Sequence, residues 1–324
     1  MGQSNILYLS RKDVEQVGLP MAEIIEALDQ MFKEKGQGKV EMPPKPGIHT
    51  RPDAFIHAMP AYIPSLGSAG MKWVSGYPGN QAKGLPYITG LLILNDPDTG
   101  VPLAVMDCRW ITAMRTGAAT AVAARYLARK DSSRVGIIAC GVQGRSNLHA
   151  LGCLFNLKAV KAYDRRPEIA GRYAEEMSVQ LHVDVEPVSE VSQAVKGMDI
   201  VVTSGPILKN PQPAIPPGWL AEGAFASPVD FDSYWQGAAI AEIDKLATDD
   251  LQQLEYYRRS GYFRSTPEPY ADLGQIAAGL KAGRQSDAER TMSINLGLAL
   301  DDMATAIRVY RRAVERGIGT ELPL

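Results

Sequence analysis

The sequence predicts an α/β protein in which a Rossmann-type, doubly wound parallel sheet occupies the middle of the chain and both ends form a second, α+β domain. Between about residues 117 and 290, short β-branched runs alternate with helix patterns, as in a parallel sheet with right-handed crossovers. Short strand candidates separated by Gly and Pro precede this stretch, and a long amphipathic helix follows it. We therefore expect two domains, 1–116 with 295–324 and 117–294, in agreement with the usual domain size of about 100–200 residues.

The N-terminal part combines one helix with short strands. Residues 19–36 carry apolar side chains at the spacing of an amphipathic helix, and a proline-rich loop follows Gly36. The expected strands are 54–63, 69–75, 87–94 and 101–106. The dense turn signal between the last two strands predicts a hairpin with a longer loop.

Two helices border the middle stretch. Residues 110–128 are rich in Gly and Ala, so that another backbone or a flat ligand can approach closely; tight helix packing alone is the simpler interpretation. The last helix, from about Asn295 to Gly317, has an apolar stripe that must be buried, most simply against the N-terminal part. The stripe consists of Leu296, Leu300, Met303, Ile307, Tyr310 and Val314. The four arginines of this helix are expected to form a solvated face.

The composition argues against several functional classes. Lys and Arg number 34 and Asp and Glu 36, so a net charge of −2 gives no electrostatic basis for binding nucleic acid. No apolar run approaches the roughly 18 residues that a membrane helix needs. The cysteines and histidines show neither a metal-site spacing nor a disulfide framework. Since the N-terminal residues also lack the apolar stretch of a secretory signal, we expect a cytoplasmic protein that binds neither nucleic acid, membrane nor metal.

The middle stretch contains a candidate dinucleotide-binding turn. Its expected strands are 134–139, 159–163, 183–187, 200–203 and 223–226, with helices from the glycine turn to Phe155, over 167–177 and over 189–196. After the first strand the chain reads Ala-Cys-Gly-Val-Gln-Gly at 139–144, which matches G-x-G-x-x-G except at Ala139. Gly141 would let a pyrophosphate approach the backbone at a helix N-terminus. The methyl group of Ala139 fits if φ stays negative there.

An acidic residue strengthens this interpretation. Asp164 lies 20 residues after Gly144, at the end of the second strand, where a carboxylate can accept hydrogen bonds from an adenine ribose. The carboxylate favours NAD over NADP, although Arg165 and Arg166 follow at once and can bind a 2′-phosphate. An ordinary β-turn-α unit with a surface aspartate remains the alternative.

Three cations occupy Gly- and Pro-rich segments of the first part of the chain. Lys45, Lys72 and Arg115 lie near expected strand ends and a helix start. Such cations suit an anionic substrate, typically a carboxylate, which Arg binds in a bidentate manner. Solvated surface charges are the alternative interpretation.

Several ordered motifs together resemble the ornithine cyclodeaminase/mu-crystallin family. They are HAMPAY (57–62), AGMKWVSGYPGN (69–80), GLPYITG (84–90), TGVPLAVMD (99–107), ITAMRTGAATAVAARYLA (111–128) and the GVQGR turn. The resemblance implies a homodimer, a substrate-binding and dimerisation domain made from both chain ends, and NAD(P)-dependent chemistry on α-amino acids or their imines. It also implies that the substrate is a small amino or imino acid.

The resemblance assigns roles to individual residues. Lys72 matches the family's substrate-binding lysine and is a candidate catalytic residue, Arg115 matches its carboxylate-binding arginine, and Lys45 lies where many members have an arginine. The catalytic aspartate matches Asp230, with Asp232 open as the alternative because the usual glycine-rich context is missing. The expected cofactor-binding residues are Thr116, Gly141, Val142, Gln143, Gly144, Asp164, Arg165 and Ser204.

His57 is a departure from the cyclising members of this family. Those members carry a glutamate where this chain has His57, and a histidine suits a second, cationic amine poorly. His57 is expected either to contact the substrate or to be a hydrogen-bonded structural residue. The expected function is therefore an oxidoreductase that reduces a carboxylate-bearing imine or oxidises the matching amino acid. A redox-neutral cyclodeaminase and a mu-crystallin-like binding protein are the alternatives.

Overall fold

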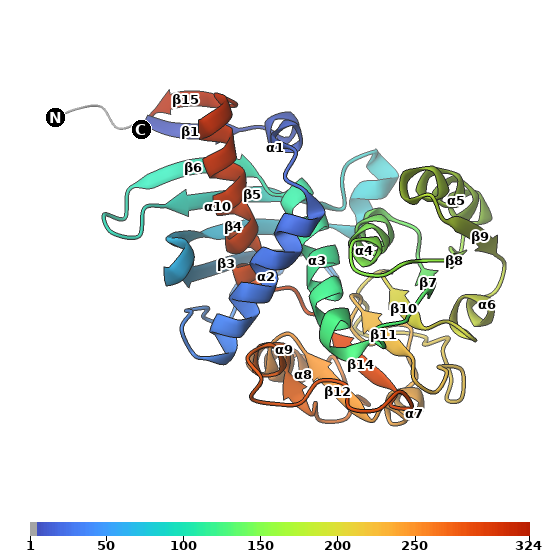
Figure 1. Cartoon of the computed structure of the whole chain (residues 1–324). Helices are drawn as coiled ribbons and strands as arrows, with labels where there is room; N and C mark the ends of the chain where they lie inside the picture. The colour runs from blue at the N-terminus through green and yellow to red at the C-terminus, as the bar shows by residue number, and fades with distance from the viewer. Residues whose placement is uncertain (1–4) are drawn as a thin grey trace. The chain divides into compact units, whose positions relative to one another are not determined.

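The computed structural model describes residues 5–324 and divides the chain into two compact units (Figure 1). Unit 1 consists of Met1–Arg115 and Leu298–Leu324, of which residues 1–4 lie outside the described part, and unit 2 is Thr116–Gly297. The sequence placed these boundaries after residues 116 and 294. Each unit has its own sheet, as expected for an α/β fold with a second domain.

Unit 1 contains a seven-stranded sheet in the order β15-β1-β6-β5-β4-β3-β2. Its strands are β1 (Asn5–Leu9), β2 (Gly47–Ile48), β3 (Phe55–Ile63), β4 (Ser68–Gly76), β5 (Ile88–Asn95), β6 (Pro102–Asp107) and β15 (Thr320–Pro323). The expected β5–β6 hairpin is present. From β3 to β6, each strand pairs antiparallel with the next one along the chain. The sequence did not predict β1, β2 or β15; β1 joins the sheet by pairing parallel to β6 and antiparallel to β15.

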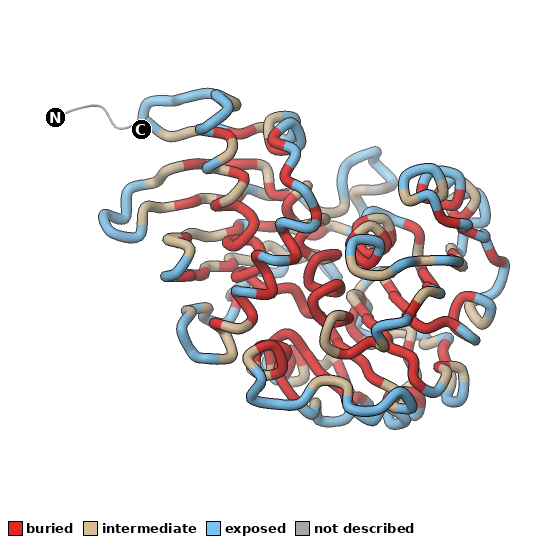
Figure 2. Tube along the Cα trace, in the orientation of Figure 1, coloured by how far each residue is buried: buried red, intermediate tan, exposed pale blue. Residues whose placement is uncertain are grey.

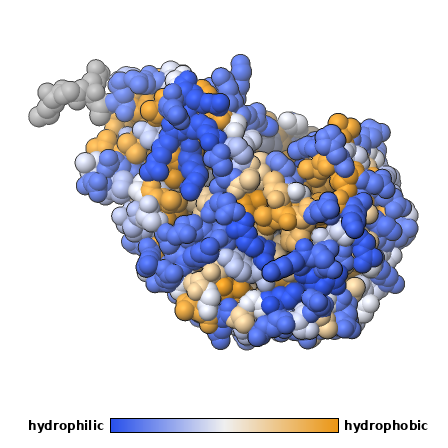
Figure 3. Space-filling model, viewed as in Figure 1, coloured by the Kyte–Doolittle hydropathy of each residue, from blue (hydrophilic) through white to orange (hydrophobic). Residues whose placement is uncertain are grey.

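The helices of unit 1 are α1 (Arg11–Val17), α2 (Met21–Gly36), α10 (Ala299–Arg316) and the start of α3 (Arg109–Leu127), with short 3-10 turns η1 (Pro64–Leu66) and η2 (Pro78–Lys83). Helix α10 crosses the sheet and contacts β3, β4 and β5 (Figure 1). Leu300, Met303 and Ile307 of its stripe are buried, whereas Val314 is 56% exposed, so the stripe ends before Val314. Hydrophilic side chains gather over α10 on the face drawn in Figure 3. Of the four arginines expected to be solvated, Arg311 and Arg316 are exposed, whereas Arg308 and Arg312 are half-buried.

Unit 2 is built on an eight-stranded sheet in the order β13-β12-β14-β11-β10-β7-β8-β9, in which every pairing is parallel. The strands are β7 (Arg134–Ile138), β8 (Ala159–Tyr163), β9 (Asp184–Val188), β10 (Ile200–Thr203), β11 (Phe225–Pro228), β12 (Lys245–Thr248), β13 (Ala271–Asp272) and β14 (Thr291–Ile294). The predicted doubly wound sheet is therefore confirmed, although the sequence missed β12, β13 and β14.

The helices of unit 2 follow its strands. They are α4 (Val142–Gly152), α5 (Pro167–Leu181), α6 (Val191–Val195), α7 (Gly237–Ile240), α8 (Leu251–Arg259) and α9 (Leu273–Ala277), with the rest of α3. The strand order reverses between β7 and β10, and such a switch point is where open α/β sheets bind ligands. The loops after these two strands are therefore the first place to look for a cofactor site.

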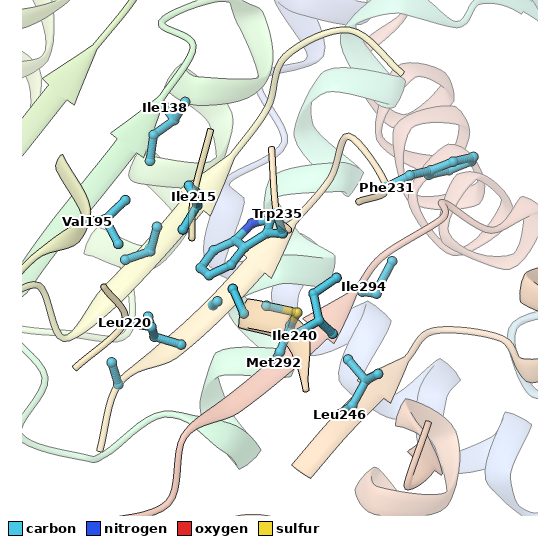
Figure 4. Close-up of a cluster of buried hydrophobic side chains, with 14 of the residues drawn as sticks. Ile138, Val195, Ile215, Leu220, Phe231, Trp235, Ile240, Leu246, Met292 and Ile294 are labelled. Atoms are coloured by element: carbon cyan, nitrogen blue, oxygen red, sulfur yellow. The ribbon is translucent and has the colours of Figure 1, made fainter. Parts of the chain in front are cut away.

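Buried residues lie in the interior of each unit, while many of the connecting loops are exposed (Figure 2). In unit 2 one apolar cluster lies around Trp235, Ile240 and Met292 beside the sheet (Figure 4). Helix α3 packs closely on α4, because a Cβ at Gly117 would lie 2.3 Å from the backbone oxygen of Ser146. The small residues of α3 thus allow a second backbone to approach, as tight helix packing requires.

Candidate active site

The turn after β7 has an unusual backbone conformation. Ala139 adopts φ 73°, in the left-handed region, so the expectation of a negative φ at this alanine was wrong. The conformation costs a non-glycine residue about 1–2 kcal/mol. Two hydrogen bonds hold it: the Ala139 amide donates to the Tyr163 carbonyl oxygen at 2.8 Å, and Ser204 Oγ donates to the Ala139 carbonyl oxygen at 2.9 Å. The first position of the glycine pattern therefore needs the conformation that glycine favours.

The two glycines of this turn have different tasks. A Cβ at Gly144 would lie 2.6 Å from the Ala139 carbonyl oxygen, so this glycine lets α4 approach the strand end. A Cβ at Gly141 would meet nothing within 4 Å. Gly141 is the N-cap of α4, and no side chain caps that helix end. Open space in front of an uncapped helix N-terminus fits the pyrophosphate of a dinucleotide.

Asp164 is fixed beside this turn. Its Oδ2 accepts a hydrogen bond from the Cys140 amide at 3.0 Å, and its Oδ1 accepts one from the Arg166 amide at 3.0 Å. Arg165 and Arg166 are exposed. The carboxylate of Asp164 therefore has a defined orientation at the end of β8, where a residue that binds the adenine ribose is expected. The two arginines remain exposed to solvent.

The other expected cofactor residues of unit 2 lie on the same turn or on elements next to it. Gln143 stands in the first turn of α4, where Ser146 Oγ donates to its side-chain oxygen at 3.3 Å. Val142 is 66% exposed at the same helix end. Ser204 connects the end of β10 to the turn through its bond to Ala139. Thr116 lies on α3, one residue before the close contact of Gly117 with α4.

Asp230 is a fully buried carboxyl group after β11. Its oxygens accept hydrogen bonds from Thr203 Oγ1 and from the Gly205 amide, each at 2.7 Å. Burial raises the pKa of Asp230 to about 7, although these hydrogen bonds oppose the change. A carboxyl group with this pKa can both donate and accept a proton near neutral pH.

Asp232 has different surroundings. Thr266 Oγ1 donates to its Oδ2 at 3.0 Å, and it lines a cavity of about 320 Å³ together with Trp235 and Tyr262. Burial also raises the pKa of Asp232. Asp230, in contrast, hydrogen-bonds to residues at the end of β10, beside the switch point.

The cations of unit 1 form a buried charge cluster on three elements. Lys72 of β4 is 1% exposed, and its Nζ lies 2.6 Å from Asp302 Oδ2 and 3.5 Å from Thr112 Oγ1. Arg115 of α3 donates from Nε to Asp302 Oδ1 at 3.2 Å and from Nη1 to Asp301 Oδ2 at 3.4 Å. Burial lowers the pKa of Lys72, and the charge of Asp302 opposes this.

The sequence did not identify Asp301 and Asp302 as site residues. Both are fully buried in the first turn of α10, next to Leu300 and Met303 of the apolar stripe. The signal that would have identified them is the pair of consecutive aspartates inside an apolar stripe that must be buried, because a buried carboxylate requires a partner.

Lys45 and His57 interact electrostatically within unit 1. Lys45 is buried, and its charge, with those of His49 and Lys72, adds to burial in lowering the pKa of His57 to about 4. The His57 ring stacks on Phe55 at a centroid distance of 4.3 Å. His57 is therefore neutral near pH 7, and the charged groups that act on it are cationic.

Metal-binding groups and membrane-spanning helices were also considered for the described residues. Within residues 5–324, no group of three or more His, Cys, Asp or Glu side chains is arranged to hold a metal ion. Among the helices of that range, none combines the length and the apolar character needed to cross a membrane.

Comparisons with known proteins extend the resemblance seen in the motifs. The model of the ornithine cyclodeaminase/mu-crystallin family matches residues 5–317. The chain is 37% identical to the alanine dehydrogenase of Archaeoglobus fulgidus over 327 residues, which cover 98% of this chain and 98% of that protein.

Two solved structures share the fold along the whole chain. One is Thermococcus litoralis Delta(1)-pyrroline-2-carboxylate reductase in complex with NADH and L-proline, with 35% identity, a TM-score of 0.89 and coverage of 98% of this chain and 100% of that one. The other is an archaeal alanine dehydrogenase dimer with bound NAD, with 33% identity, a TM-score of 0.89 and coverage of 99% and 100%.

Proposed function

The chain belongs to the ornithine cyclodeaminase/mu-crystallin family, and we propose that it is an NAD(P)-dependent oxidoreductase that reduces a carboxylate-bearing imine or oxidises the matching α-amino acid. The observation that carries the proposal is the presence, in one chain, of an open dinucleotide turn at Gly141 and a buried pair of cations, Lys72 and Arg115. The similar alanine dehydrogenase and pyrroline-2-carboxylate reductase act on small amino or imino acids and support this substrate class.

The cofactor-binding role is assigned to unit 2. NAD, when bound, supplies the hydride chemistry. The amides at the start of α4 would hold its pyrophosphate next to Gly141, and Asp164 would accept hydrogen bonds from its adenine ribose. The fixed carboxylate of Asp164 supports NAD as the preferred cofactor, and the exposed Arg165 and Arg166 leave NADP as a second one.

The substrate-binding role is assigned to unit 1. Lys72 and Arg115 would bind the substrate carboxylate, and Lys45, which is buried and acts on the same His57 as Lys72, would add a third positive charge. Fixing the α-carbon in this way contributes up to about 7–11 kcal/mol to lowering the barrier of a well-oriented reaction. Asp230 of unit 2 would donate a proton to the substrate nitrogen in imine reduction and accept one in amino-acid oxidation, since its pKa of about 7 suits both reactions.

The substrate side chain is proposed to carry no second amine. His57 is neutral, and the charges of Lys45 and Lys72 act on it. A second amine on the substrate would meet cations there rather than a carboxylate, which disfavours ornithine. This observation favours net oxidation and reduction over the cyclodeaminase reaction.

One experiment separates the proposed function from its two alternatives. The purified protein is incubated with NAD(H) or NADP(H) and a panel of amino acids and cyclic imines, while reduced nicotinamide and ammonia are both followed. Net cofactor turnover with alanine- or proline-like substrates supports the proposal. Ammonia release without net cofactor turnover identifies a cyclodeaminase, and tight cofactor binding without either product identifies a binding protein.

We propose further that the protein is a cytoplasmic homodimer. Trp73 and Leu91 are 42% and 45% exposed, and they are direct neighbours across β4 and β5. They point to the opposite face of the sheet from the buried Lys72 and Leu92. An exposed apolar sheet face suits a second copy, in keeping with the similar alanine dehydrogenase dimer. The free thiols of all three cysteines support a reducing compartment.

A further inference from the structure

We propose that Asp302 is a positioning residue, which holds Lys72 and Arg115 in place for the substrate carboxylate and keeps the Lys72 ammonium group charged. The inference rests on the proposed function for the identity of the substrate, but not for the state of the lysine. Asp302 lies on α10, whereas Lys72 and Arg115 lie on β4 and α3. One carboxylate thus joins three elements of unit 1 that are far apart in the sequence.

The geometry divides the two oxygens of Asp302 between the two cations. Oδ2 lies 2.6 Å from Lys72 Nζ, and Oδ1 accepts a hydrogen bond from Arg115 Nε at 3.2 Å. Asp302 is fully buried, and in the described part of the chain no hydrogen-bond donor other than this ammonium group comes near Oδ2. Asp302 therefore links Lys72 and Arg115 through its two oxygens.

Lys72 depends on this partner because its other charged neighbours do not favour an ammonium group. Burial lowers its pKa most, and the charge of Arg115 on α3 lowers it further. His57 on β3 also interacts with Lys72 and is neutral. Cys108, just before α3, has a pKa raised to about 11 and carries no charge at neutral pH. Asp302 is the carboxylate in contact with Lys72, and its charge acts against the lowering of the Lys72 pKa.

The neighbouring Asp301 has a different structural role and offers a matched control. Its Oδ2 accepts a hydrogen bond from the Leu298 amide at 3.0 Å, which closes the first turn of α10, and also contacts Arg115. The two aspartates are adjacent, equally buried and close to the same helix N-terminus, where negative charge is favoured. The ion pair with Lys72 is made by Asp302.

The test compares Asp302→Asn with Asp301→Asn and Asp302→Glu. For Asp302→Asn we expect unchanged NADH affinity, and an apparent KM for the amino acid that rises about 30-fold or more, as for loss of one partner of a buried charge pair. We also expect kcat/KM to fall as pH rises through the lowered pKa of Lys72, because the deprotonated amine no longer binds a carboxylate. Asp301→Asn is expected to lose thermal stability without acquiring this pH dependence. Asp302→Glu keeps the charge and moves it, so it should raise KM without the new pH dependence.

An activity-independent measurement completes the test. Lysine labelled with ¹³C at Cε is titrated by NMR, and the Lys72 signal is assigned by its loss in Lys72→Arg. We expect a lower titration midpoint for Lys72 in Asp302→Asn than in the wild type and in Asp301→Asn. Equal midpoints, or a kcat/KM that falls by one factor at every pH, would overturn the proposal. If the wild type turns over no substrate, the proposed function fails while the NMR titration still decides the role of Asp302; if Asp302→Asn does not fold, Asp302→Glu and its pH profile decide it.

Discussion

The carboxylate of Asp164 accepts a hydrogen bond from the amide of Cys140 at 3.0 Å, so the acid after β8 and the glycine turn after β7 form one connected structure. A change at Asp164 therefore affects the proposed cofactor site in two ways. It removes the expected partner of the ribose, and it releases the amide that precedes Gly141.

Asp164→Ser should weaken binding of NADH more than binding of NADPH. Loss of hydrogen bonds to a charged acceptor costs about 1.5–3 kcal/mol, which corresponds to a rise in Kd of about 10-fold or more. The affinity for NADPH should change less, because the repulsion of a 2′-phosphate by the carboxylate is removed. Titration of both nucleotides by fluorescence measures the ratio, with Glu168→Ser, an exposed acid on α5, as control. Equal loss of affinity for both nucleotides would argue for a purely structural Asp164.

Ala139→Gly should stabilise the protein. The left-handed φ of Ala139 costs about 1–2 kcal/mol, and glycine pays about 0.5–1 kcal/mol in unfolded-chain entropy, which leaves a net gain of about 0.5–1 kcal/mol. Thermal or urea unfolding measures the change. Ala139→Val, with its β-branched side chain, should destabilise strongly at the same position. A lower Tm for the glycine variant would show that the turn is not strained.

The pH dependence of turnover should follow Asp230. Its pKa of about 7 means that the carboxyl group is protonated below that pH and ionised above it. Imine reduction, which needs a proton donor, should therefore lose activity as pH rises through about 7, and amino-acid oxidation, which needs an acceptor, should gain it. Initial rates of kcat/KM measured in both directions test this. Asp230→Asn should lose most of its activity, together with the change of kcat/KM around pH 7. If that change persists in Asp230→Asn and disappears in Asp232→Asn, the proton-transfer residue is Asp232.

Arg115→Ala should raise the KM for the substrate strongly and leave cofactor affinity nearly intact. Because Arg115 also pairs with the buried Asp301 and Asp302, its removal should cost about 3–5 kcal/mol of folding stability as well. Arg115→Lys, which keeps the charge but not the fork geometry, should recover most of the stability and little of the affinity. Steady-state kinetics, nucleotide titration and thermal unfolding separate these effects. A parallel loss of substrate and cofactor affinity would indicate a structural Arg115.

Trp73→Glu should convert the proposed homodimer to a monomer. A charge on an apolar sheet face that a second copy covers would be buried without a partner. Sedimentation velocity at several concentrations measures the assembly state, and Val179→Glu, at an exposed position of α5, is the control. A wild-type protein that is monomeric at all concentrations would refute the homodimer.

The sequence predicted the parts of the fold that local patterns determine. Alternating β-branched runs and helices were enough for the doubly wound sheet, and the glycine spacing located the turn at Gly141. Strand β12, by contrast, has four residues and includes Lys245, so its pattern is too short and too polar to be recognised. The ends of the chain gave no strand signal, because β1 and β15 become a pair only through contact between residues about 315 apart in the sequence.

The candidate site also contains residues that local motifs predicted and contacts that they did not. Motifs drew attention to Lys72, Arg115 and Asp230, but not to what surrounds them. The partner of Lys72 lies on the last helix, and no local spacing connects β4 with Asp302. The left-handed conformation of Ala139 also escaped prediction, since it depends on hydrogen bonds from separate strand ends.

The composition of unit 1 from two distant segments has a consequence for biosynthesis. Unit 2 is continuous, so a ribosome has synthesised all of its residues before it begins α10. Since domains fold as units during synthesis, the sheet of unit 1 must wait for β15 to pair with β1 and for α10 to cover it. Until then the nascent chain holds Lys72 without its counter-charge, and a truncation before residue 298 would leave that lysine in water rather than in a core.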